Sequence, residues 1–174
     1  MKRKLIRLYD ITLCTAFGAG FWPWGPGTMG AVVGVALWWL ASLLLPYKAL
    51  IIATVLAIAV VTVVSIPSIN RLERKWGPDP SRVVIDEVVG VWVCLLMVPK
   101  PMAWAMPYFT TWYWVVAAFV LFRLLDIFKP LPFIRRMEQL PRGLGVMMDD
   151  VVAGIVGALI MACAQLCILE FFVP

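Results

Sequence analysis

The sequence contains no histidine and only four cysteines, so the side chains that most often bind zinc or act as nucleophiles are scarce. A mechanism that needs an imidazole as base, nucleophile or metal ligand is therefore excluded. The cysteines form no Cys-x-x-Cys pair, and neither Cys14 nor Cys94 heads a Cys-x5-Arg loop. Charged residues are also few, at 14% of the chain, against about 25% in soluble proteins.

Hydrophobic residues, in contrast, make up 63% of the 174 residues, against about 45–50% in an ordinary soluble protein. Nine tryptophans and nine phenylalanines, many near the ends of apolar runs, suit an aromatic belt at a membrane interface. This composition predicts a polytopic membrane protein. The N-terminus is basic but has no apolar stretch before Asp10, so it is expected to be retained and not cleaved as a signal peptide.

The apolar runs predict an all-α bundle of about five membrane spans, formed by a single domain over residues 1–174. The predicted spans are residues 28–45, 49–66, 83–98, 103–125 and the run that follows Asp149 and Asp150. Pro46 and Pro67 are expected to end the first two. Residues 11–27 hold too many glycines and prolines for a regular span, so a short interfacial or re-entrant helix followed by a turn is expected there.

Several local features follow from this division. Thr28 is placed as the N-cap of the first span, and Gly30 and Gly34 allow close contact between helices. The third run is short for a span, which is consistent with a start inside a water-filled recess. Residues 67–82 and 133–146 are predicted polar connections, and residues 99–101 a brief turn.

Lysine and arginine lie almost entirely on one side of the predicted membrane. Thirteen fall on the side of the N-terminus, and only Lys48 and Lys100 fall on the other. Because positively charged loops remain in the cytoplasm, the N-terminal side is predicted to be cytoplasmic. This distribution accounts for the net charge of +5 without a nucleic-acid partner. A lipid-headgroup-facing rim is expected from Arg71, Arg74, Lys75, Arg135 and Arg136.

Four polar clusters that are far apart in the sequence fall at one depth on that side. They are the turn Pro26-Gly27-Thr28, Asp86-Glu87, Arg123-Asp126 and Asp149-Asp150. Each alone has an ordinary explanation, as a turn, an i,i+3 ion pair or a helix cap. Their coincidence at one face of the membrane favours a functional site.

Charge balance at this layer points to a metal ion. Five carboxylates face only two cations, Arg123 and Lys129, and unpaired charge is costly in a membrane. Protons or cations must therefore neutralise the excess. With oxygen ligands only, a hard ion is favoured, most of all Mg²⁺ with some of its waters, and such a site also binds phosphate. The residues expected to hold the ion, directly or through waters, are Asp86, Glu87, Asp149 and Asp150.

Helix geometry limits how these acids can act. Adjacent residues point about 100° apart, so one of Asp149 and Asp150 is expected to bind the ion and the other to orient or cap. The same limit applies to Asp86 and Glu87. Gly90 and Gly154 each lie four residues after a carboxylate, where they would let another helix approach closely.

Residues able to hold an anion accompany the acids. The turn before the first span offers backbone N–H groups and the Thr28 hydroxyl at a helix N-terminus. Arg123, Asp126 and Lys129 are spaced by three, so neighbouring members lie within reach along one helix edge. Arg123 can hold either Asp126 or a phosphate.

These blocks resemble the phosphatidylglycerophosphatase A family of bacterial inner-membrane lipid phosphatases. The matching blocks are residues 18–30, 84–92, 119–132 and 143–154, in the family's order. Trp22 departs from the pattern, because the family usually has serine there, which leaves Thr28 as the remaining hydroxyl of that motif. The resemblance implies an all-helical fold and Mg²⁺-dependent removal of the terminal phosphate from phosphatidylglycerol phosphate, which yields phosphatidylglycerol.

The resulting hypothesis is hydrolysis of a phosphomonoester at the cytoplasmic interface. The expected catalytic residues are Asp126, Asp150, Thr28, Arg123 and Lys129. The expected substrate-binding residues are Pro26, Gly27, Thr28, Arg123 and Lys129. Attack by water is favoured over a phospho-aspartate, because the chain has no Asp-x-Asp-x-Thr pattern. A transporter coupled to cations or protons, or a membrane scaffold, are the alternatives, and the oligomeric state and lipid range stay open.

Overall fold

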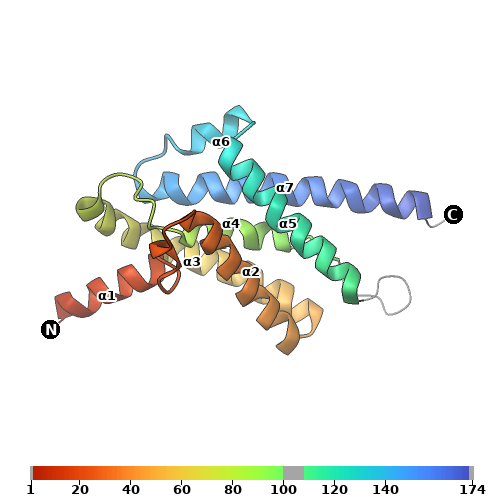
Figure 1. The fold of residues 1–174 in the computed structure, drawn as a ribbon, viewed down its shortest axis with the longest axis horizontal. Coiled ribbons are helices and arrows are strands. Elements are labelled where there is room, and N and C mark those ends of the chain that lie inside the picture. Colours follow the sequence, from red (N-terminus) through yellow and green to blue (C-terminus); the bar gives the residue numbers. More distant parts are fainter. Residues whose placement is uncertain (1, 100–107, 173–174) are drawn as a thin grey trace.

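The computed structural model describes residues 2–99 and 108–172. In that part of the chain all the regular secondary structure is helical, and no strand is present (Figure 1). The elements are α1 (Lys2–Cys14), the 3-10 helix η1 (Ala19–Phe21), α2 (Pro26–Leu44), α3 (Tyr47–Trp76), α4 (Ile85–Leu95), α5 (Tyr108–Phe128), α6 (Pro132–Met137) and α7 (Gly143–Phe172). The predicted all-α architecture is confirmed. Residues 103–107 of the fourth predicted span, and residues 100–101 of the turn before it, lie outside the described residues.

In the part of the chain that the structure describes, four helices are long and apolar enough to cross a membrane: α2, α3, residues 111–128 of α5 and residues 143–168 of α7. Only 17% to 28% of the most apolar window of each is buried inside the protein. In water, the rest of each window would expose apolar surface at a cost of about 25 cal/mol per Å². Lipid must therefore surround these helices, and the protein is a helical membrane bundle.

The third predicted span, residues 83–98, forms the short helix α4 at the centre of the bundle. Eleven residues extend only about 16 Å, and nine of them are buried against the neighbouring helices. Burial of nearly all of its residues places α4 inside the protein and not against lipid. The run ends where the Tyr47 hydroxyl donates to the Val98 carbonyl, at 3.1 Å. Residues 83–98 therefore extend to the depth in the bundle at which α3 begins, at Tyr47. Helix α4 itself is too short to count as a full span.

Glycines allow α2, α4 and α7 to pack with their backbones close together. A Cβ atom on Gly34 would lie 2.6 Å from the Val91 side chain, and one on Gly154 would collide with the Gly90 carbonyl oxygen. Only hydrogen fits at these crossings, so larger residues would push the helices apart. The close approach predicted at Gly34, Gly90 and Gly154 is confirmed.

The second predicted span does not end at Pro67. Helix α3 continues through this proline to Trp76, and its last turns pack Ile69 and Leu72 into a core shared with α1 and α4. Proline frees a carbonyl on the preceding turn, but burial of these side chains holds the helix together. The predicted boundary was wrong because tertiary packing overrides the local signal. Residues 67–76, expected to be a polar connection, are helical.

Helix α7 begins at Gly143, six residues earlier than predicted. The Gly143 N–H donates to the Asn70 side-chain oxygen at 2.9 Å, which ties the start of α7 to α3. Asp149 and Asp150 therefore lie in the second turn of α7, so neither is an N-cap. This removes the simplest alternative explanation for the pair.

The N-terminal helix is held to α3 by an ion pair. Arg71 donates two hydrogen bonds to Asp10, at 2.6 and 2.9 Å, and a third to Ser68 at 3.0 Å. Burial alone would raise the pKa of Asp10, but the bonds from Arg71 and Ser68 bring this pKa below its ordinary value. Arg71, predicted to belong to a lipid-headgroup-facing rim, is exposed, and its guanidinium also anchors α1. After α1, positive φ angles at Ala16, Phe17 and Gly18 turn the chain into η1.

Candidate metal and phosphate site

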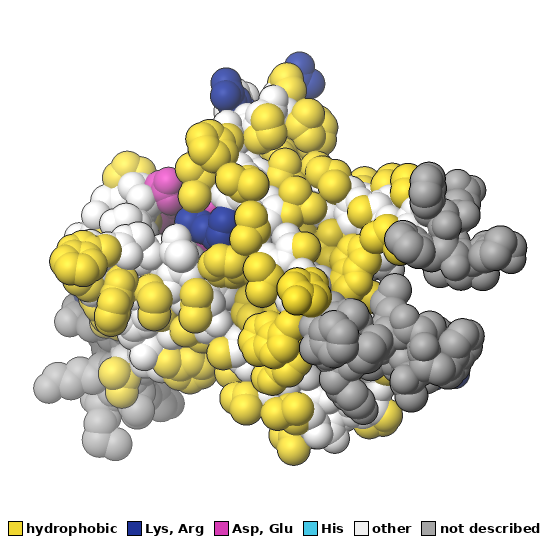
Figure 2. Space-filling model, turned by 45° about the vertical axis from the view of Figure 1, so that its right-hand side comes forward, with side chains coloured by type: hydrophobic (Ala, Val, Ile, Leu, Met, Phe, Trp, Pro, Cys, Tyr) yellow, Lys and Arg dark blue, Asp and Glu magenta, His cyan; other side chains and the backbone are white. Residues whose placement is uncertain are grey.

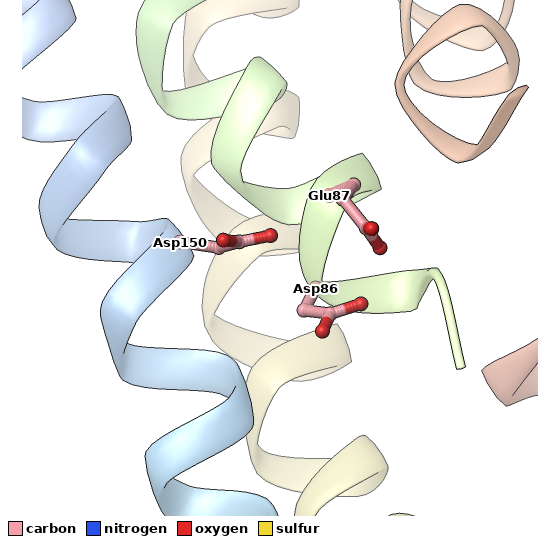
Figure 3. Close-up of side chains that lie close together, drawn as sticks. All are labelled: Asp86, Glu87 and Asp150. Carbon is pink, nitrogen blue, oxygen red and sulfur yellow. The ribbon is translucent and has the colours of Figure 1, made fainter. Parts of the chain in front are cut away.

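Three carboxylates from two helices meet in the interior of the bundle (Figure 3). Asp86 and Glu87 lie in the first turn of α4, and Asp150 projects from the second turn of α7. One carboxylate oxygen from each residue lies within 4.8 Å of the other two. The predicted convergence of these two clusters is therefore present in the fold.

The cluster is buried and incompletely hydrogen-bonded. Asp86 is 8% exposed and Asp150 is 3% exposed. Among the described residues, Asp86 Oδ1, Glu87 Oε2 and the neighbouring Asp149 Oδ1 have no hydrogen-bond donor. A buried oxygen without a donor costs about 1–3 kcal/mol, and more when the group is charged. A cation between these oxygens would remove that cost, and an all-oxygen set fits a hard ion such as Mg²⁺.

Asp86 and Glu87 both contribute to the cluster, although one of the two was expected to orient or cap and not to bind the ion. Val84 is the N-cap of α4, and it makes no side-chain capping bond. The two acids therefore sit just inside the helix start, where the longer glutamate can reach the space that the aspartate faces. Neither acid caps the helix, so the capping alternative fails here as well.

Asp149 and Asp150 point to different partners, as predicted for adjacent helical residues. Asp149 accepts a hydrogen bond from Lys129 Nζ at 2.8 Å, and Lys129 also pairs with Glu138. Burial would lower the pKa of Lys129, but its bonds to Asp149 and Glu138 raise this pKa above its ordinary value. Lys129 is thus a permanent cation that holds Asp149, while Asp150 joins the cluster with Asp86.

Arg123 connects the acids to the end of α5. Its Nη1 donates to Asp126 Oδ2 at 2.6 Å and lies 4.0 Å from Glu87 Oε1. The i,i+3 pair predicted from spacing is confirmed, and Arg123 Nε still has no partner among the described residues. Lys129 follows the end of α5 with a φ of 43°, so it does not continue the helix edge that carries Arg123. Arg123 therefore keeps donor capacity beside the cluster.

The start of α2 lies against the same residues. A Cβ on Gly27 would collide with Glu87 Oε1 and lie 3.3 Å from an Arg123 nitrogen. Helix α2 begins at Pro26 with Gly25 as N-cap, and no side chain caps it. The N–H groups of the first turn are therefore free to bind an anion. Thr28 was predicted as the N-cap, but it is the third residue of the helix and its side chain is exposed.

A cavity of about 310 Å³ opens beside Asp86 and Asp149. The other ionisable residues of its wall are Glu73, Asp79, Glu138 and Arg142. None of these was singled out from the sequence, because they lie in segments expected to be plain polar connections. The pairing of Glu138 with Lys129 depends on α6 folding back onto α7, for which the sequence has no local signal.

The described residues define a class of protein: a polytopic helical membrane protein whose buried carboxylates and arginine fit a divalent cation and a phosphate group. Residues 12–165 match the family model described as Phosphatidylglycerophosphatase A. The chain belongs to the phosphatidylglycerophosphatase A family, and the protein is a phosphatase. This assignment sets aside the transporter and the scaffold considered from the sequence.

Three relatives cover most of the chain. Proteins of Escherichia coli and Haemophilus influenzae, both named phosphatidylglycerophosphatase A, are each 32% identical, covering 84% and 88% of this chain and 77% and 86% of their own lengths. A protein of Bacteroides thetaiotaomicron, named provisionally as a phosphatidylinositol-3-phosphatase, is 46% identical over 89% of this chain and 92% of its own. No solved structure matches the chain.

Proposed function

We propose that the protein removes the terminal phosphate of phosphatidylglycerol phosphate in a Mg²⁺-dependent reaction, at the cytoplasmic side of a bacterial inner membrane. The observation that carries this proposal is the buried group of Asp86, Glu87 and Asp150 beside Arg123. Its unpartnered carboxylate oxygens call for a cation, and the adjacent guanidinium offers donors to a phosphate. The names of the 32%-identical relatives support the lipid substrate.

Asp86, Glu87 and Asp150 would hold the Mg²⁺ ion, which when bound polarises the phosphate and activates a water molecule. Asp149 was expected as a fourth ligand. Its hydrogen bond with Lys129 favours a different role, in which Asp149 fixes the position of that cation. Of the two adjacent aspartates, Asp150 is therefore the proposed ligand.

The phosphate oxygens would be bound by Arg123 and by the free N–H groups of Gly27 and Thr28. These groups belong to two helices, and Gly27 brings them together because it has no side chain to separate α2 from Arg123. Lys129 adds positive charge at the edge of the site. Binding by backbone N–H groups and a guanidinium is the usual means of holding a phosphate.

Hydrolysis then requires one proton acceptor. The oxygen of the attacking water forms a bond to phosphorus, and the bond between phosphorus and the glycerol oxygen breaks. Asp126 would accept the water proton and pass it to the leaving oxygen, so that protons balance. Arg123 holds the Asp126 carboxylate at 2.6 Å, which keeps this base oriented.

The cytoplasmic orientation rests on the distribution of basic residues. In the topology predicted from the sequence, thirteen lysines and arginines fall on the side of the membrane that carries the site, and two fall on the other. Cysteine variants at Lys48 and at exposed Arg136, labelled in intact cells with a membrane-impermeant thiol reagent, test this. Labelling at position 48 alone is expected, and labelling at position 136 alone would reverse the orientation.

A second candidate substrate is a phosphorylated phosphatidylinositol, because the 46%-identical relative carries the name of a phosphatidylinositol-3-phosphatase. Both lipids present a phosphomonoester, and the proposed contacts of Arg123 and Gly27 engage only that group. The headgroup beyond the phosphate must therefore be tested directly.

The test uses the purified full-length protein in detergent micelles, with release of inorganic phosphate as the measurement. Phosphatidylglycerol phosphate is expected to be hydrolysed with Mg²⁺ and not in excess EDTA, and Asp150→Asn is expected to be inactive. Full activity in EDTA would overturn the metal proposal. Higher kcat/KM on phosphatidylinositol 3-phosphate would reassign the substrate while leaving the site intact.

A further inference from the structure

An apolar groove of about 530 Å³ runs between α2 and α5, away from the acidic cluster. Its walls carry two matching stripes with i, i+4, i+7 spacing: Val32, Ala36 and Trp39 on α2, and Trp112, Val116 and Phe119 on α5. The groove is open along its length, since Val32 is 43% and Val116 is 51% exposed. Trp39 and Trp112 stack with their ring centroids 4.5 Å apart, forming one end of the groove.

The other end of the groove leads to the proposed phosphate site. Val32 lies four residues after Thr28, and Phe119 lies four residues before Arg123, so each stripe continues on the same helix face into a site residue. From Val32 to Trp39 the groove extends about 10 Å along α2, and Thr28 lies about one turn beyond it. On the face in Figure 2, basic and acidic side chains lie together at the border of a field of hydrophobic ones.

We propose that this groove binds an acyl chain of the lipid phosphate substrate, with the phosphate at Arg123 and the chain directed toward the tryptophan pair. This inference rests on the proposed function and extends it to the apolar part of the substrate. A lipid phosphate is anionic at one end and apolar at the other, which matches the polarity of the groove and its end. The cavity beside Asp86 is lined by carboxylates and suits no acyl chain.

The occupant follows from this polarity and from the openness of the groove. The lining of the groove is apolar, and the stripe on α5 continues to Arg123, so a ligand that is apolar along its length and anionic at one end matches both. A lipid diffusing in the bilayer enters from the side, because the groove faces the surrounding lipid along α2 and α5. The stacked Trp39 and Trp112 rings then set how deep a chain can reach, so they would select for chain length.

The test fills the groove without touching the site. Ala36→Trp places an indole in the middle of the groove, and Ala59→Trp adds the same indole to an exposed alanine on α3, outside the groove. The KM for long-chain phosphatidylglycerol phosphate in mixed micelles is measured at several surface concentrations. We expect Ala36→Trp to raise this KM roughly tenfold, with kcat and hydrolysis of a short-chain analogue unchanged, and Ala59→Trp to match the wild type.

A KM for Ala36→Trp equal to that of Ala59→Trp would refute acyl-chain binding in the groove. This face would then contact only the lipids of the surrounding bilayer. If Ala36→Trp fails to fold, Val116→Phe fills the groove from the opposite wall and gives the same readout. In addition, Trp39→Ala opens the far end, so its preferred chain length is expected to increase; an unchanged preference would contradict the limit set by the tryptophans. If the wild-type protein releases no phosphate from any lipid, the proposed function is refuted. That result differs from an unchanged KM in Ala36→Trp, which refutes only the groove.

Discussion

Replacing Asp150 with asparagine tests the metal site through stability, without reliance on activity. Oxygens of Asp86, Glu87 and Asp150 lie within 4.8 Å of one another, where two unit charges repel by about 3.5 kcal/mol at an effective dielectric constant of 20. Asp150→Asn removes two of the three pairwise repulsions and keeps the shape of the side chain. The metal-free variant should therefore unfold at a higher temperature than the metal-free wild type.

Magnesium should reverse this order. A ligand at 100 times its Kd stabilises the folded state by about 2.7 kcal/mol, and each kcal/mol raises Tm by about 2–4 °C for a chain of this size. The wild type should thus gain roughly 5–11 °C with saturating Mg²⁺, whereas Asp150→Asn should gain almost nothing. Thermal unfolding followed by tryptophan fluorescence, in detergent with EDTA or with Mg²⁺, measures both changes.

Asp149→Asn is the matched control, since it changes the neighbouring carboxylate by the same atoms. It breaks the bond with Lys129 and should lower Tm in EDTA, but it should keep most of the response to Mg²⁺. The reasoning is refuted if Asp150→Asn retains the full Mg²⁺ response. A loss of that response in Asp149→Asn alone would identify Asp149 as the ligand.

Three further predictions concern the surroundings of the cluster. Gly27→Ala forces a methyl group against Glu87, so it should cost about 1–3 kcal/mol of stability and lower kcat/KM about 100-fold; wild-type activity would contradict the close approach of α2. Arg123→Ala should lower kcat/KM by about 10²–10³, and Arg123→Lys should recover little because lysine lacks the planar donor fork; equal activity of Arg123→Lys and wild type would argue against this contact. The pKa of Asp10 in the folded protein lies below its unfolded value of about 3.9. The ion pair with Arg71 therefore stabilises the protein above that pH, and this stabilisation is lost as the pH falls through the lower folded-state pKa. Tm measured from pH 3 to 7 should show the loss in the wild type, and Asp10→Asn should remove it.

The sequence was sufficient to predict which residues converge, because spanning helices fix the depth of each residue along the membrane normal. Once apolar runs were recognised as helices, the polar clusters could fall only at one face or the other. The acids of α4 and α7 do meet, and Gly90 and Gly154 lie at a close helix crossing as their spacing indicated. Glycine patterns are informative here because close backbone contact in a bundle admits few other residues.

Helix ends and side-chain partners could not be predicted in the same way. Helix α3 passes Pro67 because Ile69 and Leu72 are buried beyond it, and α7 starts early because Asn70 binds its first N–H. Each of these causes lies on another helix, so no local signal records it. The separate partners of Asp149 and Asp150 depend on the rotation of α7 about its axis, which only the packed bundle fixes.

The contact between Gly90 and Gly154 acts as a pivot for the two helices that carry the carboxylates. Asp86 and Asp150 each precede their glycine by four residues, so each acid stands only about 6 Å along the axis from the point where the backbones touch. If changes in bilayer thickness tilt α7 by 10° about this pivot, such a short lever moves its carboxylate by roughly 1 Å. The same tilt would displace an acid at the far end of the helix by a several times larger distance. A tilt of α7 about this crossing would therefore change the distances between the three carboxylates only slightly.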